Sequence, residues 1–175
     1  MRLITYNRIK KTAVLIIVSL LMMTAVSCKG KEEEKTYRDF LGEEIYDASV
    51  FAMVVETIEG EEEPGVIYRK VLDFNNVISR CDIPICLYFF SSTKTDSAGV
   101  TAGVEDIAQL LDGRLLVVGI DILQNRDLVG KYDITMVPDF VLVEQNVQKA
   151  AFGSEGYDYW TTTDVYNWII EQGIS

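Results

Sequence analysis

The sequence predicts an α/β domain of three layers, in which a mixed central sheet is flanked by helices on both faces and an extra strand is added at the N-terminal side. Two continuous apolar runs, Ile85–Phe90 and Leu115–Ile122, are typical of strands buried on both faces. Between them, apolar residues recur at helical spacing (Val100, Val104, Ile107, Ala108 and Leu111). Strands and helices that alternate in this way form parallel neighbours joined by helical crossovers.

The elements before the first buried strand follow from local signals. Val50–Val55 and Val66–Leu72 are strand-like, and an acidic turn that ends at Pro64 separates them. Asp73 is a suitable N-cap for a short helix over residues 74–80. This part of the chain is therefore predicted to contribute two strands and one helix.

The C-terminal third is predicted to add a short helix, a hairpin and a final helix. Arg126–Tyr132 has the length of a short helix, and Phe140–Val143 and Val147–Phe152 are strand-like segments joined by a tight turn. Thr161, followed three residues later by Asp164, is an N-cap signal for the last helix. From Val66 onward the predicted order is βαβαβαββα.

The first 27 residues have the pattern of a secretory signal. They contain four basic and no acidic residues, and the apolar run Thr12–Val26 is shorter than the roughly 20 residues that span a bilayer. Ala25-Val26-Ser27-Cys28 resembles the lipobox of bacterial lipoproteins, which implies that Cys28 is lipidated after cleavage. A permanent single-span anchor is the alternative. We expect residues 1–27 to be a lipoprotein signal peptide, 28–45 the lipidated cysteine with a charged tether, and 46–175 the folded domain.

This organisation implies a place in the bacterial cell envelope. The acylated N-terminus would hold the chain at a lipid bilayer, on the periplasmic or the surface side. Lys29 is not the aspartate that commonly retains lipoproteins at the inner membrane, so the outer membrane is favoured.

Charge and composition exclude several functions. From Cys28 onward the chain has 12 basic and 27 acidic residues, which disfavours nucleic acid as a partner because phosphate backbones are bound by Lys and Arg. The sequence contains no His, which excludes Ser-His and Cys-His nucleophile pairs and His-ligated metals. We expect no cofactor and no metal site.

From about residue 66 to 174 the chain resembles the thioredoxin family. The most specific part runs from Gly113 to Val143 and contains an acidic residue that ends a strand, an amide pair, a Lys-Tyr pair and a Val-Pro pair before the next strand (Asp121, Gln124-Asn125, Lys131-Tyr132 and Val137-Pro138). The resemblance implies a thioredoxin-like fold, and it implies that Pro138 is the cis-proline of the family.

The segment that carries catalysis in thioredoxins is different in this chain. The resemblance places Lys94-Thr95-Asp96-Ser97 where the family has its Cys-x-x-Cys, within the polar loop Ser91–Ser97, and Tyr88 where the family has a buried acid. Residues 87–175 contain no Cys at all. Disulfide exchange needs a thiolate and a resolving thiol, so no catalytic residue is expected at this loop.

The expected function is therefore that of a redox-inactive, protein- or peptide-binding accessory module whose partner is an unknown envelope protein or peptide. In the family the backbone beside the cis-proline pairs with an extended substrate segment, a form of strand addition. The corresponding groove candidates are Phe90, Thr93, Lys94, Val137, Pro138 and Gly153. Binding of a small anion by Lys94 at the start of a helix is an alternative, as is a solvated loop without function.

Cys81 and Cys86 leave three alternatives open. An exported chain can keep a disulfide, but a bridge across this spacing needs a bend around Asp82–Pro84. The two residues can instead be buried free thiols. As a redox-active pair they would make the protein an extracytoplasmic thiol-disulfide oxidoreductase or a peroxide-handling enzyme, which is the alternative function.

Overall fold

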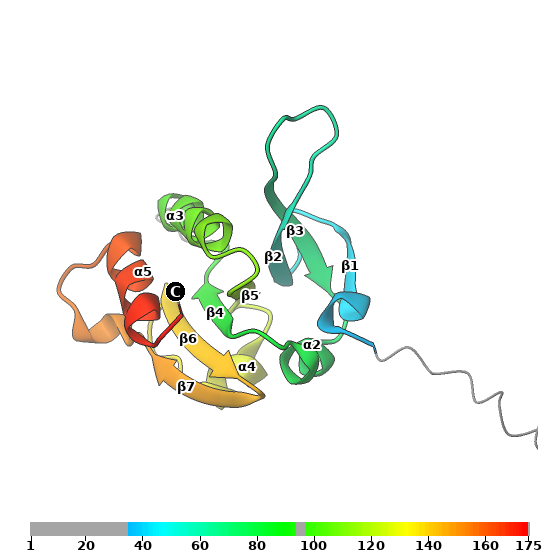
Figure 1. Cartoon of the computed structure of the whole chain (residues 1–175). Coiled ribbons are helices and arrows are strands. Elements are labelled where there is room, and N and C mark those ends of the chain that lie inside the picture. The colour runs from blue at the N-terminus through cyan, green and yellow to red at the C-terminus, as the bar shows by residue number, and fades with distance from the viewer. Residues whose placement is uncertain (1–34, 94–96, 175) are drawn as a thin grey trace, which may run out of the picture. The chain divides into compact units, whose positions relative to one another are not determined.

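The computed structural model describes residues 35–93 and 97–174. Within these residues, seven strands form one mixed sheet in the order β1-β3-β2-β5-β4-β6-β7 (Figure 1). The strands are β1 (Leu41–Glu44), β2 (Val50–Glu56), β3 (Gly65–Val71), β4 (Ile85–Phe90), β5 (Leu116–Asp121), β6 (Asp139–Glu144) and β7 (Val147–Ala151). The helices are η1 (Tyr37–Phe40), α2 (Phe74–Arg80), α3 (Ser97–Leu110), α4 (Arg126–Lys131), η2 (Ser154–Gly156) and α5 (Thr162–Glu171). The predicted signal peptide and the lipidated Cys28 lie outside the described residues.

Strand β4 lies at the centre of the sheet, as its continuous apolar run predicts. It pairs in parallel with β5 and antiparallel with β6. Ile85, Leu87 and Phe89 point into one core, and Cys86 and Tyr88 point into the other. Every residue of β5 is also buried. An unbroken apolar run is needed because both faces of these two strands are covered by helices.

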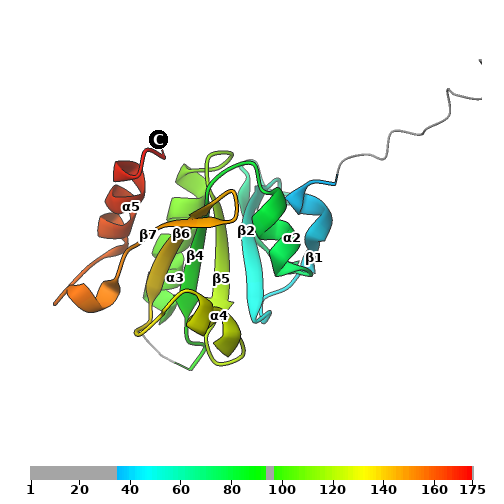
Figure 2. The same cartoon turned by 90° about the horizontal axis from the view of Figure 1, so that it is seen from below.

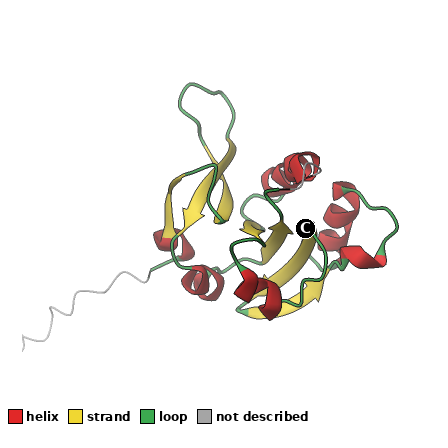
Figure 3. Cartoon of the chain, turned by 180° about the vertical axis from the view of Figure 1, so that it is seen from behind, coloured by secondary structure: helices red, strands yellow, loops and turns green. Residues whose placement is uncertain are grey.

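The two cores lie on opposite faces of the sheet, which gives the predicted three layers (Figures 2 and 3). Helices α3 and α5 cover one face with the apolar positions that the helical spacing predicts, among them Val104, Leu111 and Ile169. Helix α2 covers the other face through Val77 and Ile78, together with residues from η1 and α4. The α/β fold with a mixed sheet flanked by helices is confirmed.

The helix starts agree with the capping signals in the sequence. The Asp73 carboxylate accepts a hydrogen bond of 3.0 Å from the Asn76 backbone N–H at the start of α2. Thr161 and Asp164 form a reciprocal capping box at the start of α5. Both contacts satisfy N–H groups that the first turn of a helix leaves without a partner.

From β4 to α5 the chain has the thioredoxin-like arrangement that the resemblance implies. Strands β5, β4, β6 and β7 are neighbours in that order, with α3 and α5 on one face and α4 on the other. The peptide bond between Val137 and Pro138 is cis, immediately before β6, so the prediction made for Pro138 is confirmed.

The N-terminal part has two features that the sequence did not predict. The extra strand β2 pairs directly and antiparallel with β5, and it separates β5 from β3. The folded unit also begins near Lys35 rather than at residue 46, because η1 and β1 belong to it. Tyr37 is buried in the core beneath α2, and β1 forms the edge of the sheet beside β3. The boundary of the charged tether at residue 45 was therefore wrong.

In the part of the chain that the structure describes, we find no helix with the length and apolar character needed to cross a membrane.

The insertion of β2 depends on a glycine. Gly119 of β5 lies opposite Phe51 of β2, and a Cβ atom at Gly119 would overlap the Phe51 ring. We expect Gly119→Ala to lower the free energy of unfolding by roughly 1–3 kcal/mol, the usual cost of overpacking a core, as measured by urea denaturation.

Gly130→Ala is the matched control, because a Cβ atom at this position in α4 has no neighbour within 4 Å. Alanine is the better helix former, so this variant should be unchanged or more stable by up to about 1 kcal/mol. Equal stability of Gly119→Ala and the parent chain would contradict the assigned pairing of β2 with β5.

Candidate functional site

The candidate site lies at the carboxyl end of β4, where the loop that is catalytic in thioredoxins begins. Phe89 pairs with Asp139, which places Pro138 beside Phe90 across the β4–β6 ladder. Ser91 is buried and its hydroxyl lies 3.1 Å from that of Thr93, whose side chain is exposed. The start of the loop therefore lies next to the proline, and Lys94 is outside the described residues.

Tyr88, at the position where the resemblance places a buried acid in thioredoxins, carries a neutral phenol. The side chain is fully buried, stacks on Phe140 with ring centroids 5.3 Å apart, and its hydroxyl lies 3.1 Å from the Thr101 hydroxyl of α3. Burial raises the pKa of Tyr88 above its usual value, so the phenol keeps its proton at neutral pH. This position can tie β4 to α3, but it cannot accept a proton from a thiol.

The two cysteines of the folded unit are free thiols on opposite faces of the sheet. Cys81 follows α2 and packs into the core beneath that helix, whereas Cys86 in β4 packs into the core beneath α3. Burial raises the pKa of Cys81 to about 11 and that of Cys86 to about 12. Neither thiol lies at the loop after β4. Of the alternatives that the sequence left open for Cys81 and Cys86, the structure shows two buried free thiols and no disulfide between them.

Asp139 connects the proline to the segment after β7. Its buried carboxylate accepts hydrogen bonds from the backbone N–H groups of Phe140 at 2.8 Å and Ser154 at 3.1 Å. Burial raises the pKa of this carboxyl above its usual value. Gly153, with a left-handed φ of 67°, precedes Ser154. The structure therefore brings Phe90, Val137, Pro138 and Gly153 to one end of the sheet, at the carboxyl end of β4, which we call the peptide edge. Thr93 belongs to the loop that follows Phe90.

Met136 is an exposed apolar residue at this same edge that sequence reasoning missed. Its side chain is 50% exposed, and it immediately precedes the buried Val137 and the half-buried Pro138. Met136 lies in the loop between α4 and β6 and belongs to no periodic run, so only its position two residues before Pro138 could have suggested a binding role.

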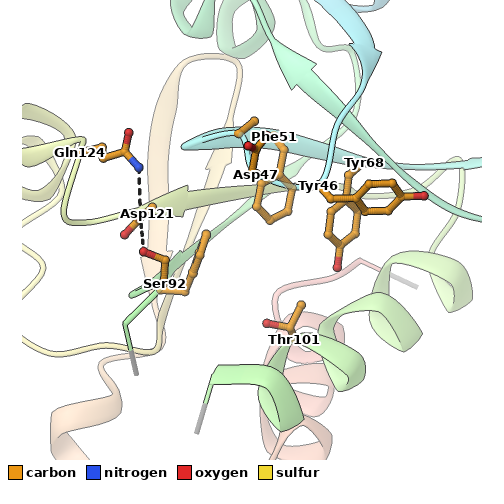
Figure 4. Close-up of a pocket in the computed structure, with 10 residues that line it drawn as sticks. Tyr46, Asp47, Phe51, Tyr68, Ser92, Thr101, Asp121 and Gln124 are labelled. Carbon is orange, nitrogen blue, oxygen red and sulfur yellow. Dashed lines mark hydrogen bonds between the residues drawn. The ribbon is translucent and has the colours of Figure 1, made fainter. Parts of the chain in front are cut away.

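A pocket of about 440 Å³ lies on the other side of the loop, next to β5 (Figure 4). Its walls carry four aromatic and five polar side chains: Tyr46, Phe51, Tyr68 and Phe90, and Asp47, Ser92, Thr101, Asp121 and Gln124. The aromatic residues come mainly from β2, β3 and the segment after β1. Sequence reasoning used Asp121 and Gln124 only as family markers, because the inserted β2 that completes the pocket could not be placed.

Asp121 holds together the loops that follow β4 and β5. Its carboxylate accepts hydrogen bonds from the Ser92 hydroxyl at 2.8 Å and from the Leu123 backbone N–H at 3.1 Å, with the Gln124 amide 3.4 Å away. Within the described ranges, no group of three or more Cys, Asp or Glu side chains is arranged to hold a metal ion.

Comparisons with known proteins find similarity only at the level of structure. No family model matches the chain, and no curated protein does. The germline-specific thioredoxin Deadhead of Drosophila melanogaster is 21% identical, with a TM-score of 0.46, over 51% of this chain and 81% of that one. Thioredoxin-2 of the malaria parasite, described as a component of its protein secretion machinery, is 18% identical, with a TM-score of 0.43, over 51% and 82%. A structure described as a malarial protein is also 18% identical, with a TM-score of 0.43, over 51% and 96%.

The burial of the two thiols predicts a specific reactivity. In a Cys28→Ser variant, which leaves Cys81 and Cys86 as the only thiols, iodoacetamide at pH 8 should modify both residues at least about 100-fold more slowly in the native than in the urea-unfolded chain. This factor follows from a pKa of about 11 rather than 9 for Cys81, since only the thiolate reacts.

Mass spectrometry of the digested protein measures the two sites separately. The native rate should stay low until the pH approaches 11, where Cys81 begins to ionise. Rapid modification of either cysteine in the native chain near neutral pH would contradict the assigned burial.

Proposed function

We propose that the protein is a redox-inactive, thioredoxin-like binding module that holds an extended segment of a partner protein at the peptide edge next to Pro138. The observation that carries this proposal is that the strand end and the cis-proline lie together as in thioredoxins, while the loop between them and α3 contains no cysteine. Phe90 and Pro138 lie side by side as in the resemblance, while the loop 91–97 has no Cys and both core thiols are buried elsewhere.

The edge offers the features that peptide recognition needs. Strand addition takes its affinity from main-chain hydrogen bonds and its specificity from side-chain contacts. The exposed Met136 supplies an adaptable apolar contact, Thr93 a hydroxyl, and Gly153 a position without a side chain. Asp139 fixes the segment that carries Gly153, so the position of this glycine is preorganised.

A place in the bacterial envelope completes the proposal. The lipobox-like Ala25-Val26-Ser27-Cys28 would anchor the module by a lipid on Cys28, and residues 29–34 would lead to the folded unit that begins at Lys35. Such a module would present its binding edge to proteins of the same membrane, the outer membrane being favoured, on its periplasmic or surface side.

Nothing in the described residues favours the alternative of a thiol-disulfide oxidoreductase or peroxide-handling enzyme using Cys81 and Cys86. Such an enzyme needs an accessible thiol with a lowered pKa. Both thiols are buried, and burial raises the pKa of each.

The proposed edge can be tested with peptides selected on the full chain from a random nine-residue library. Met136→Glu places a charge beside the proline and should weaken the selected peptides by roughly 5- to 30-fold, the loss expected when one apolar contact of about 1–2 kcal/mol is removed. Fluorescence anisotropy of labelled peptides measures the dissociation constants.

Leu110→Glu is the matched control. Leu110 is an equally apolar and similarly exposed residue, at 61%, but it ends α3 at the opposite end of the sheet from the loop after β4. Its variant should bind as the parent does. Selection of no peptide, or equal losses in the two variants, would count against the proposed edge.

A further inference from the structure

The pocket beside β5 lies apart from the proposed peptide edge. Both flank Phe90, but the peptide edge lies toward β6 and Pro138, whereas the pocket lies toward β5, β2 and β3. A volume of about 440 Å³ is within the range of small-molecule sites. The pocket can therefore be considered on its own chemistry, and its role does not depend on the proposed function.

One wall of the pocket is a continuous aromatic surface. Phe51 and Tyr68 stack with ring centroids 4.6 Å apart. Phe90 lies against Phe51 at 5.7 Å, and Tyr46 lies against Tyr68 at 6.2 Å. Figure 4 shows Tyr46, Phe51 and Tyr68 gathered on one side, with Ser92, Asp121 and Gln124 on the other. Tyr46 is 81% exposed, so an apolar ring at the mouth of the pocket is left open to a ligand.

Carboxylates surround this aromatic wall. Asp121 and Asp47 line the pocket, and Asp121 is only 2% exposed. The hydroxyl groups of Tyr46 and Tyr68 donate hydrogen bonds to Glu44 and Glu105, respectively. Four acidic side chains thus face or hold the residues of one small pocket.

Of these four acids, Glu44 lies opposite Arg69 across β1 and β3 and interacts with its charge, whereas the described residues that line the pocket include no basic side chain. No Lys or Arg is among the residues that line the pocket, and the ion pairs within the described ranges use Glu56 and Glu144 instead. The chain as a whole also has a net charge of −11. A cation entering the pocket would meet the exposed ring of Tyr46 and the exposed carboxylate of Asp47, both of which attract positive charge. The buried Asp121 carboxylate, which accepts hydrogen bonds from Ser92 and Leu123, adds negative charge deeper in the pocket.

We propose that this pocket binds an organic cation, an alkylammonium or guanidinium group, with its apolar part against Phe51 and Tyr68 and its charge near Asp47 and Asp121. An anion would be repelled by the same carboxylates. A purely apolar ligand would gain from the rings but would leave the carboxylate of Asp121 beside apolar atoms. The group can belong to a small free amine or to a Lys or Arg side chain of a peptide.

The experiment is a titration of the full chain, in detergent, followed by two-dimensional ¹H–¹⁵N NMR. The probes are n-butylammonium, the capped peptide Gly-Gly-Lys-Gly-Gly, and the same peptide with uncharged norleucine in place of Lys. We expect the two cationic probes to shift the amide signals of Phe51 and Asp121, and we expect weaker binding at 0.5 M than at 0.05 M salt. The norleucine peptide should bind at least about 3-fold more weakly than the lysine peptide.

The adjacent exposed residues Tyr46 and Asp47 provide the test variant, and a similar exposed pair before α5 provides the control. The double variant Tyr46→Leu, Asp47→Asn should weaken the cationic probes by roughly 3- to 30-fold, as expected from losing one cation–π contact and one carboxylate. Asp158→Asn, Tyr159→Leu makes the same two changes in the loop before α5, where Tyr159 is 82% exposed. This control should bind as the parent does.

The outcomes separate the two sources of the cation. Tighter binding of the lysine peptide than of butylammonium assigns the pocket to a basic side chain, and tighter binding of butylammonium assigns it to a free amine. The proposal is overturned if the norleucine peptide binds as well as the lysine peptide, if neither cationic probe binds, or if both double variants bind as the parent does. None of these results depends on the peptide edge beside Met136, so the two proposals can fail separately.

Discussion

The pairing of β4 with β5 on one side and β6 on the other is the constraint on which the rest of the structure depends. Because β4 is buried on both faces, its register against both neighbours is fixed by the packing of alternate residues into two cores. That register places Phe90 at the carboxyl end of β4, between Asp121 at the end of β5 and Pro138 before β6. The proposed peptide edge lies on one side of Phe90 and the pocket lies on the other.

The same constraint keeps both thiols of the folded unit away from the loop after β4. Cys86 is part of β4 and is held in the core beneath α3, while Cys81 lies in the core on the opposite face. Tyr88 is buried in β4, and its hydroxyl lies beside that of Thr101 in α3. The loop after β4 and the cis-proline lie next to each other at the peptide edge, and the acidic side chains gather at the pocket on the other side of Phe90. Those properties suit binding.

Periodicity predicted the elements well because it reports how each segment is buried. The runs at Ile85–Phe90 and Leu115–Ile122, the helical spacing from Val100 and the caps at Asp73 and Thr161 all correspond to elements of the structure. Strand order is a matter of long-range pairing, and the insertion of β2 beside β5 had no local signal except Gly119, which leaves room for Phe51. The start of the folded unit was missed because Tyr37 and Phe40 stand in a polar stretch that resembles a tether. The pocket was also missed, because its walls come from β2, β3 and the segment after β1, whose pairing had no local signal in the sequence.

The central claim is that this scaffold binds but does not exchange disulfides, and an insulin reduction assay with dithiothreitol as the electron donor tests it most directly. The full chain should give the same rate of insulin precipitation as buffer alone, and the same rate as a Cys81→Ser, Cys86→Ser double variant, because neither buried thiol can reach a substrate. Turnover above the buffer rate that disappears in the double variant would contradict the account.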